Sequence, residues 1–162
     1  MQALFDNLLR GEPVWDFCCD HGYLGLSAYR SGYFPEVHFV DQVPHIIQKL
    51  KVRFDEKHFR EAYPQRAFFW AQSGETVAAT AGGTAVIAGV GMHTISDILQ
   101  GIHEKNSLKF NRLILSSHNY EEKLEQFLET WEPFLRTYKR TSVCEVFENG
   151  RNRKLLIFDK IL

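Results

Sequence analysis

The sequence has few cysteines, no long apolar run and no spacing typical of metal ligands. Cys18 and Cys19 are adjacent and Cys144 is distant, so the three thiols form neither a disulfide framework nor a zinc pattern, and an odd number fits reduced thiols. The seven histidines are scattered, and we expect no metal site. No apolar stretch approaches the roughly 18 to 20 residues that span a bilayer, and the N-terminus lacks the features of a secretion signal. We therefore expect a cytoplasmic protein without membrane contact.

The sequence also lacks an excess of positive charge. Its 19 Lys and Arg residues and 20 Asp and Glu residues give a formal net charge of -1, without the global basic field typical of nucleic-acid-binding proteins. Any contact with nucleic acid must use a local patch. One candidate is the basic C-terminal segment, which contains Arg136, Lys139, Arg140, Arg151, Arg153, Lys154 and Lys160. This segment and the acidic stretch before it can equally be solvated faces.

The composition that remains is that of an ordinary α/β protein. With 162 residues, of which 44% are hydrophobic, the chain can bury one full core but not two, so we expect a single domain over residues 1–162. Short apolar runs alternate with stretches whose apolar residues recur at helical spacing, which is typical of parallel βαβ units. The expected strands are Val14–Cys18, Val37–Asp41, Ala67–Ala71, Ala85–Gly89 and Arg112–Ser116.

Helices are expected between these strands, and a hairpin is expected after them. The apolar helical faces are Ile46, Leu50 and Phe54; Ile95, Ile98, Leu99 and Ile102; and Leu124, Phe127, Leu128 and Trp131. After Pro133, the runs Ser142–Phe147 and Lys154–Phe158 flank an Asn-Gly turn signal at positions 149 and 150. The pattern predicts a Rossmann-like α/β fold whose mostly parallel sheet is closed by a C-terminal antiparallel hairpin. This layout is that of class I methyltransferases, although the hairpin also fits other doubly wound proteins.

Ligands of an open parallel sheet bind beyond the carboxyl ends of its strands, and the first two such ends carry acids. Asp16 lies within the first strand, and Asp20, His21 and Gly22 follow it. This loop is too poor in glycine to cradle a pyrophosphate, so a dinucleotide does not fit. Asp41 ends the second strand, where an ionised carboxylate can accept both hydroxyls of an adenosine ribose.

The loops after the fourth and fifth strands are also unusual. Gly89 and Gly91 allow the backbone to approach a ligand just before a helix. The fifth strand ends in Ser116-Ser117-His118-Asn119, four hydrogen-bonding side chains in a row. Structural roles stay open for all of these residues. Asp16 and Asp20 can cap backbone amides, and Asp41 can be a solvated acid at a strand end. The glycines can form a tight turn, and His118 and Asn119 can begin a helix.

Three segments carry a family resemblance. Asp16–Leu24, which reads D-F-C-C-D-H-G-Y-L, resembles the D-I-G-[ST]-D-H-[AG]-Y-L segment of the bacterial tRNA (adenine(22)-N1)-methyltransferase family. Ile87–Met92 is similar to that family's I-A-G-M-G-G segment, and Leu113–Asn119 is similar to its L-I-L-Q-P segment and the asparagine after it. The resemblance, which covers about the whole chain, implies a class I methyltransferase fold, S-adenosyl-L-methionine as cofactor and adenine N1 of a tRNA as acceptor.

Together, the strand ends and the resemblance assign the site residues. The expected cofactor-binding residues are Asp16, Cys18, Gly22, Asp41, Gly89 and Gly91. The expected catalytic residues are Asp20, His21 and Asn119, with Asp20 stabilising positive charge that develops on the methylated base. The tRNA, or another RNA, is expected to contact the basic hairpin at the edge of the sheet far from Asp41.

The sequence departs from the family pattern at several positions. Cys18 replaces a glycine that lets the backbone lie against the cofactor, so Cys18→Gly is expected to tighten cofactor binding while it weakens the strand. Ser116-Ser117 replace Gln-Pro, Met92 replaces a glycine and Gly25 replaces a proline. The helical extension with which relatives hold tRNA is not expected after the hairpin. A non-catalytic binding module, a methyltransferase for a small acceptor, and any oligomeric state therefore stay open.

Overall fold

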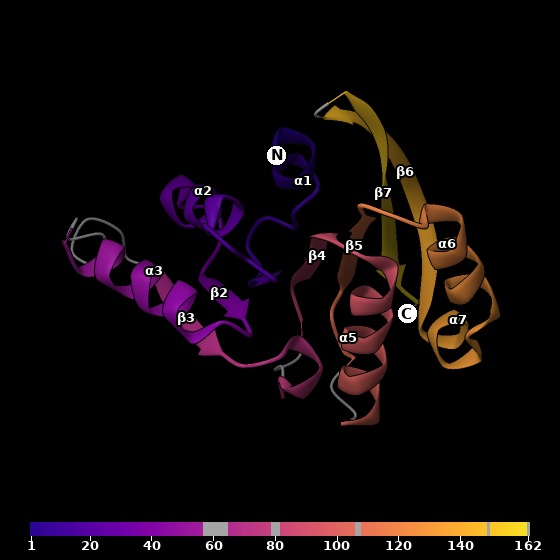
Figure 1. Cartoon of the computed structure of the whole chain (residues 1–162), viewed down its shortest axis with the longest axis horizontal. Coiled ribbons are helices and arrows are strands. Elements are labelled where there is room, and N and C mark those ends of the chain that lie inside the picture. The colour runs from indigo at the N-terminus through magenta and orange to yellow at the C-terminus, as the bar shows by residue number, and fades with distance from the viewer. Residues whose placement is uncertain (57–64, 79–81, 106–107, 149, 162) are drawn as a thin grey trace.

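A computed structural model describes residues 1–56, 65–78, 82–105, 108–148 and 150–161, which form a seven-stranded sheet with helices on both faces (Figure 1). The strands are β1 (Val14–Phe17), β2 (Glu36–Asp41), β3 (Arg66–Ala71), β4 (Thr84–Val90), β5 (Arg112–Ser117), β6 (Tyr138–Glu148) and β7 (Arg151–Lys160). The helices are α1 (Gln2–Asp6), α2 (Tyr23–Ser31), α3 (Pro44–Glu56), α5 (Met92–Glu104), α6 (Glu121–Thr130) and α7 (Glu132–Thr137), with a 3-10 turn η1 at Gly74–Thr76.

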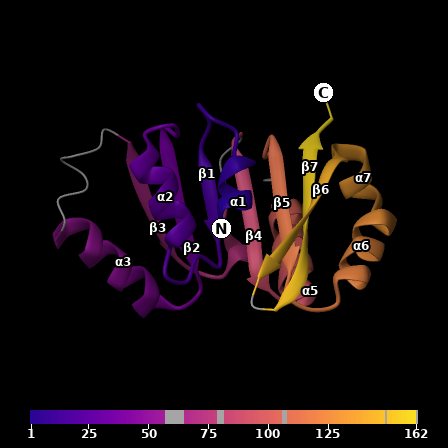
Figure 2. The same cartoon turned by 90° about the horizontal axis from the view of Figure 1, so that it is seen from above.

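The order of the strands confirms the predicted fold class. The sheet runs β3-β2-β1-β4-β5-β7-β6, as Figure 2 shows from above. The strands β1 to β5 are parallel, with Val14 of β1 level with Val37 of β2 and with Thr84 of β4. The strand β7 is antiparallel to both β5 and β6, so a C-terminal hairpin closes a parallel sheet as expected. The chain reverses its strand order at β1 and β4, where open α/β sheets bind ligands.

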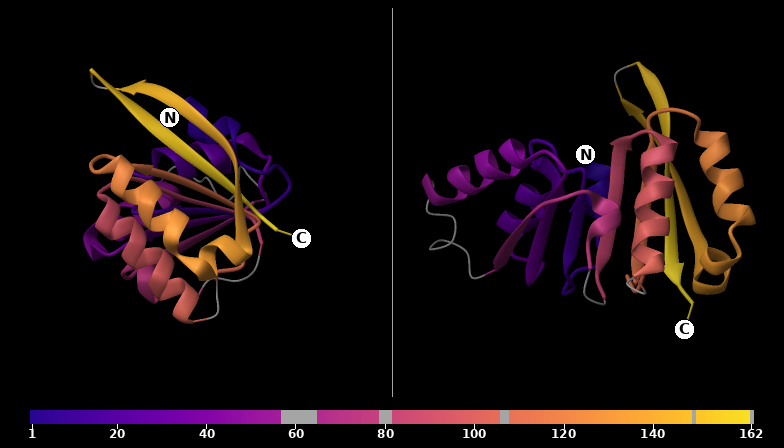
Figure 3. Two further views of the ribbon diagram at one scale, coloured as in Figure 1. Left: turned by 90° about the vertical axis from the view of Figure 1, so that its right-hand side faces the viewer. Right: turned by 60° about the horizontal axis from the view of Figure 1, so that its bottom comes forward.

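Two apolar cores hold the helices to the sheet, one on each face. The helices α1 to α3 cover one face and α5 to α7 cover the other, as the edge-on view of Figure 3 shows. All four residues of β1 are buried, as a strand covered on both faces requires. On α3 the buried residues are Ile47, Leu50 and Phe54, and the expected Ile46 is half-buried and packs against the same core, so Ile47 makes the core-facing stripe wider than predicted. Of the helices that the described residues form, none is long and apolar enough to cross a membrane.

The ends of β1 and β4 differ from the prediction at residues with a positive φ. The strand β1 ends at Phe17, one residue before the expected end, because Cys18 has a φ of 55°. The strand β4 continues to Val90 through a bulge at Gly89, whose φ is 76°. Both deviations occur at the carboxyl edge of the sheet, next to where a ligand would lie.

The hairpin is longer than the sequence predicts. Its two strands pair along their length, from Tyr138 opposite Lys160 to Glu148 opposite Arg151. The register shifts once, between Arg140 and Ser142. Gly150 has the positive φ that the predicted turn needs, whereas Asn149 lies outside the described residues. The strand β7 pairs with β5 only from Leu156 to Asp159, so the half of the hairpin near its turn projects past the carboxyl ends of the parallel strands (Figure 1).

Two short helices have no counterpart in the prediction. The helix α1 has five residues, with no acid in its first turn and no side-chain cap, so it carries no sequence signal of a helix start. The helix α7 begins around Pro133, which the pattern suggested as the end of helical structure. Proline fits the first turn of a helix because the missing N–H has no partner there.

Candidate functional site

A cavity of about 370 Å³ lies at the carboxyl ends of β1, β2 and β4. Cys18 and Asp20 line it after β1, Asp41 lines it at the end of β2, and Gly89 lines it in β4. The side chains of Glu75, Thr94 and Ile98 close it on the side of η1 and α5. This is where the fold places its ligands, and the volume is at the lower end of the ~300–1,000 Å³ common for small-molecule sites.

Asp41 is the most completely positioned acid in this cavity. Its side chain is buried, the backbone N–H of Val43 donates to Oδ1 at 2.9 Å, and that of Asp20 donates to Oδ2 at 3.2 Å. These two bonds fix the orientation of the carboxylate. Each oxygen has two lone pairs, so each can still accept one further hydrogen bond. The geometry suits a ligand that offers two adjacent hydroxyl groups.

Asp16 lies behind the cavity wall and does not line it. Its buried carboxylate accepts the backbone N–H of Gly25 at 3.1 Å and so joins β1 to α2. Burial raises the pKa of Asp16 to about 7, and the nearby charge of Asp41 adds to this effect. Asp16 thus caps a backbone amide, which was the structural alternative for this residue.

Cys18 forms part of the cavity wall next to Asp41. Burial, together with the negative charges of Asp41 and Asp16, raises the pKa of the Cys18 thiol to about 12. Burial also raises the pKa of the neighbouring Cys19 thiol. Both thiols are therefore protonated at neutral pH, a state unsuited to redox or nucleophilic chemistry. Within the described residues, no group of three or more His, Cys, Asp or Glu side chains is placed to hold a metal ion.

The three glycines of the expected cofactor site have different positions. Gly89 lines the cavity, and its positive φ is one that other residues rarely adopt. Gly22 precedes α2, and a Cβ there would lie 2.8 Å from Cδ2 of Leu50. Gly91 precedes α5, and a Cβ there would lie 3.0 Å from Oδ1 of Asn119. Of the expected cofactor-binding residues, the structure therefore brings Cys18, Asp41 and Gly89 to the cavity and uses Gly22 and Gly91 for packing.

The expected catalytic residues fall into two places. Asp20 lines the cavity with its side chain 68% exposed, and its Oδ2 lies 3.8 Å from Nε2 of His21. His21 does not line this cavity but lines a neighbouring pocket along α3, together with Asp20. Asn119 lies after β5, where its Oδ1 accepts the backbone N–H of Met92 at 3.3 Å. The helix α2 has no side-chain cap, so Asp20 does not have the capping role that was its structural alternative.

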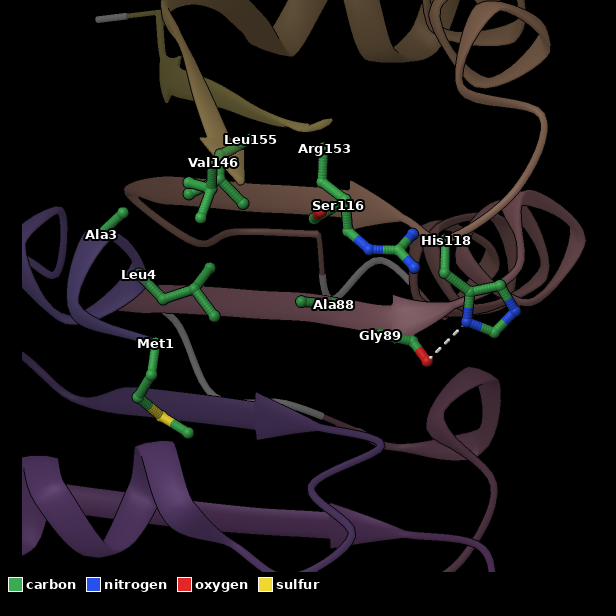
Figure 4. Close-up of a pocket in the computed structure, with 10 residues that line it drawn as sticks. All are labelled: Met1, Ala3, Leu4, Ala88, Gly89, Ser116, His118, Val146, Arg153 and Leu155. Atoms are coloured by element: carbon green, nitrogen blue, oxygen red, sulfur yellow. Dashed lines mark hydrogen bonds between the residues drawn. The ribbon is translucent and has the colours of Figure 1, made fainter. Parts of the chain in front are cut away.

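A second pocket, of about 340 Å³, lies across β4 from this cavity (Figure 4). It is enclosed by α1, the ends of β4 and β5, and the overhanging hairpin, and Gly89 lines both pockets. His118 lies at its mouth with Nδ1 3.0 Å from the carbonyl oxygen of Gly89. The sequence did not indicate this pocket, because α1 has no sequence signal and the position of Arg153 depends on the length of the hairpin.

The basic segment and the acidic helix before it are not separate faces. Glu125 of α6 accepts hydrogen bonds from Arg140 of β6 and from Lys154 of β7, each at 2.8 Å. These two cations lower the pKa of Glu125. Arg136 pairs with Glu132 within α7 at 2.7 Å. The expected basic patch is therefore smaller than the sequence suggests. Among the described residues, Arg151 and Arg153 stay unpaired at the overhanging end of the hairpin, whereas Lys139 and Lys160 lie at its opposite end.

A family comparison decides the class of this protein. Residues 1–135 match the model of the family described as a methyltransferase domain. The chain belongs to this methyltransferase family. Among the curated proteins, none matches the chain in sequence.

Solved structures agree with this methyltransferase assignment at low sequence identity. The tRNA methyltransferase TrmK of B. subtilis superposes with a TM-score of 0.78 at 17% identity, and the match covers 98% of this chain and 64% of TrmK. The Streptococcus pneumoniae protein Sp1610, solved in complex with S-adenosyl-L-methionine, gives 0.76 at 20% identity over 98% of this chain and 71% of its own. An rRNA methylase of Streptococcus thermophilus gives 0.69 at 14% identity over 99% and 93% of the two chains.

At these identities the likeness establishes the methyltransferase fold. The expectation of S-adenosylmethionine is confirmed at the level of the family and of the ligand bound to Sp1610. The resemblance to the tRNA (adenine(22)-N1)-methyltransferases is distant, because the match with TrmK has 17% sequence identity and covers 64% of the length of TrmK.

Proposed function

We propose that this methyltransferase domain binds S-adenosylmethionine in the cavity beside Asp41 and transfers its methyl group to a base in RNA. The observation that carries the proposal is the Asp41 carboxylate, which is held by two backbone N–H groups and has two acceptor positions left at a strand end. The ribose of the cofactor offers two adjacent hydroxyl donors, which match those positions. Family membership and the ligand of Sp1610 support this choice of cofactor.

Methyl transfer requires the protein mainly to hold the donor and the acceptor in the right positions. The lone pair of the acceptor nitrogen forms a bond to the methyl carbon as the carbon–sulfur bond breaks and its electron pair stays on sulfur. The protein therefore has to align two ligands and exclude water between them. Adenine N1 has its own lone pair and becomes cationic when it is methylated, so a nearby acid stabilises the product. Asp20, at the cavity, is the candidate acid, while His21 beside it and Asn119 after β5 are proposed to position the ligands.

The acceptor that we propose is adenine N1 of a tRNA. The three sequence segments and the shape of TrmK support this choice, and Arg151 and Arg153 at the overhanging end of the hairpin offer cations for phosphates. A tRNA acceptor places the protein in the cytoplasm. A domain of this kind that keeps the fold but binds no cofactor is the second candidate, because Cys18 lines the cavity at a position where the family pattern has glycine.

Calorimetric titration with S-adenosylmethionine and S-adenosylhomocysteine tests the cofactor. We expect both to bind, and Asp41→Ala to weaken them about 10- to 150-fold, as the loss of charge-assisted hydrogen bonds predicts. Asp97→Ala, which removes an exposed acid from α5, is the matched control and should leave the affinity unchanged. Absence of binding by the parent protein would exclude the methyltransferase proposal and favour the non-catalytic module.

A further inference from the structure

We propose that the second pocket, between α1, the ends of β4 and β5 and the hairpin, is the acceptor pocket, and that it takes one nucleotide of an RNA. The base would enter between apolar walls, and its phosphate would bind Arg153. This inference rests on the proposed function and adds to it the place and the residues that hold the acceptor.

The position of Gly89 connects this pocket to the cofactor cavity. Ala88 faces the second pocket, whereas Ile87 packs in the core on the face of α5, so the two pockets lie on opposite sides of β4. Gly89 lies between them and lines both. A Cβ built on Gly89 would meet no atom within 4 Å, so the space beside its backbone is open. A methyl donor on one side and an acceptor on the other can therefore meet at this bulge.

Arg153 is the cation that the pocket leaves available. Its side chain is half-buried and extends from β7 across the pocket toward His118 (Figure 4). Throughout the part of the chain that the structure describes, its guanidinium has no ion pair or hydrogen bond, whereas Arg140 and Lys154 of the same hairpin are bound to Glu125. A half-buried guanidinium has lost part of its hydration and can regain hydrogen bonds from an anion, and its planar fork matches a phosphate.

Two further polar groups at the pocket suit the edge of a base. The carbonyl oxygen of Gly89 can only accept, so Nδ1 of His118 carries the proton in the bond between them, and Nε2 of the neutral ring is a hydrogen-bond acceptor. The hydroxyl of Ser116 lines the pocket without a hydrogen-bond partner among the described residues. A hydroxyl can both donate and accept, so the pair can recognise an exocyclic amine and a ring nitrogen.

The remaining walls of the pocket suit a flat base, and a neighbouring groove gives the RNA backbone a way out. Leu4 of α1, Val146 of β6 and Leu155 of β7 give the pocket apolar sides. His118 and Arg153 also line an open groove of about 410 Å³ that continues past Lys123 and Arg151. The second pocket thus shares Gly89 with the cofactor cavity and shares His118 and Arg153 with this groove, so it lies between the two.

A binding experiment tests this assignment with fluorescein-labelled oligoadenylate of ten nucleotides and saturating S-adenosylhomocysteine. Arg153→Gln should weaken RNA binding about 10- to 100-fold, the range expected for charge-assisted hydrogen bonds. Lys160→Gln, the same charge change at the opposite end of β7, should alter it less than about 3-fold because its effect is only that of net charge. Ala3→Trp, which places an indole ring in the pocket from α1, should abolish RNA binding without any change of charge.

Calorimetry with S-adenosylhomocysteine on the same variants separates the possible failures. Unchanged cofactor affinity with the expected losses of RNA binding supports the pocket. Equal effects of Arg153→Gln and Lys160→Gln, or RNA binding that survives Ala3→Trp, would overturn it while the cofactor proposal stands. A parent protein that binds S-adenosylhomocysteine but no RNA would overturn the nucleotide as occupant. If the protein bound RNA in an Arg153-dependent manner but bound no cofactor, the pocket would be supported as an RNA site and the proposed methyl transfer would be overturned.

Discussion

Cys18 stands in a backbone conformation that side chains disfavour, at the edge of the cofactor cavity. Its φ of 55° costs an L-residue roughly 1–2 kcal/mol, a cost that glycine avoids. Cys18→Gly should therefore raise the free energy of unfolding by about 1 kcal/mol, contrary to the weakening expected for a strand residue, and should tighten S-adenosylhomocysteine binding. Urea denaturation and calorimetry measure the two effects. Cys19→Gly is the control and should destabilise, and weaker ligand binding by Cys18→Gly would show that the sulfur packs against the ligand.

Asp16 should give the stability of the protein a distinctive pH dependence. Its folded-state pKa of about 7 lies above the ordinary value near 4, so the native state holds this proton more tightly and loses stability as the pH rises from about 4 to about 7. Each pKa unit corresponds to about 1.4 kcal/mol. In Asp16→Asn the amide oxygen can still accept the N–H of Gly25, but no charge develops. The variant should therefore gain stability relative to the wild type between pH 5 and pH 8.

The comparison with Asp16→Asn is needed because His38 acts in the opposite direction. This buried ring stacks on Trp15 at 3.6 Å and accepts a hydrogen bond from Nε1 of Trp70, and burial lowers its pKa to about 4. Its contribution to stability therefore rises between about pH 4 and pH 6.5. Denaturant melts of both proteins at each pH isolate the contribution of Asp16. A difference in stability that stays constant with pH would contradict the assignment.

Single site residues could be predicted from sequence where their role depends on the local strand pattern. Asp41 belongs to this group, because the end of a buried parallel strand is visible as the end of an apolar run. The structural roles of Gly22 and Gly91 could not be predicted in this way. The atoms that exclude a side chain at these positions belong to Leu50 and Asn119, which are distant in sequence. Asp16 was expected to bind the cofactor, and its contact with Gly25 could not be predicted because it depends on how α2 packs.

Among the elements, the hairpin is joined to the sheet by an ion pair in addition to the backbone pairing of β7 with β5. Arg112 of β5 donates from Nε and Nη2 to the two carboxylate oxygens of Asp159 in β7, at 2.6 and 2.9 Å, and from Nη1 to the carbonyl oxygen of Asn7 after α1. Arg112 therefore holds two walls of the proposed acceptor pocket in place.

Asp159→Asn should lower the free energy of unfolding by about 1–2 kcal/mol, because it leaves a partly buried guanidinium with a weaker partner. Glu132→Gln removes the exposed pair with Arg136 and should change it by less than about 0.5 kcal/mol. Urea denaturation measures both variants. Equal losses would show that the pair between β5 and β7 contributes no more than a surface pair.

Helices and strands could be predicted from sequence when their apolar pattern was long enough to be recognised. The five parallel strands and the hairpin were expected, and each lies within a residue or a few of its predicted bounds. The helices α1 and α7 were missed because five or six residues show less than two turns of periodicity. The bulge at Gly89 could not be predicted because it follows from how β4 pairs with β5.

At the scale of the whole molecule, total charge could be predicted but its distribution could not. The net charge of -1 follows from composition, whereas the pairing of Glu125 with two hairpin cations depends on how α6 packs beside β6. Three cations, Lys123, Arg151 and Arg153, border the groove next to the second pocket. At about 0.7 per phosphate on single strands, they predict a slope of about -2 for log affinity against log salt. A much steeper slope in anisotropy titrations would place additional RNA contacts elsewhere.

The shared position of Gly89 between two pockets on opposite faces of β4 also has a kinetic consequence. The cofactor cavity is bordered by α5 and η1, so S-adenosylhomocysteine can leave it without passing α1 or the hairpin. It can therefore be exchanged for S-adenosylmethionine while an RNA stays in the second pocket. Steady-state kinetics should then show random order of addition. S-adenosylhomocysteine should inhibit competitively against S-adenosylmethionine and noncompetitively against RNA, whereas competition against both would mean a common entrance. The same enzyme molecule could thus methylate successive adenines of one bound strand before it dissociates.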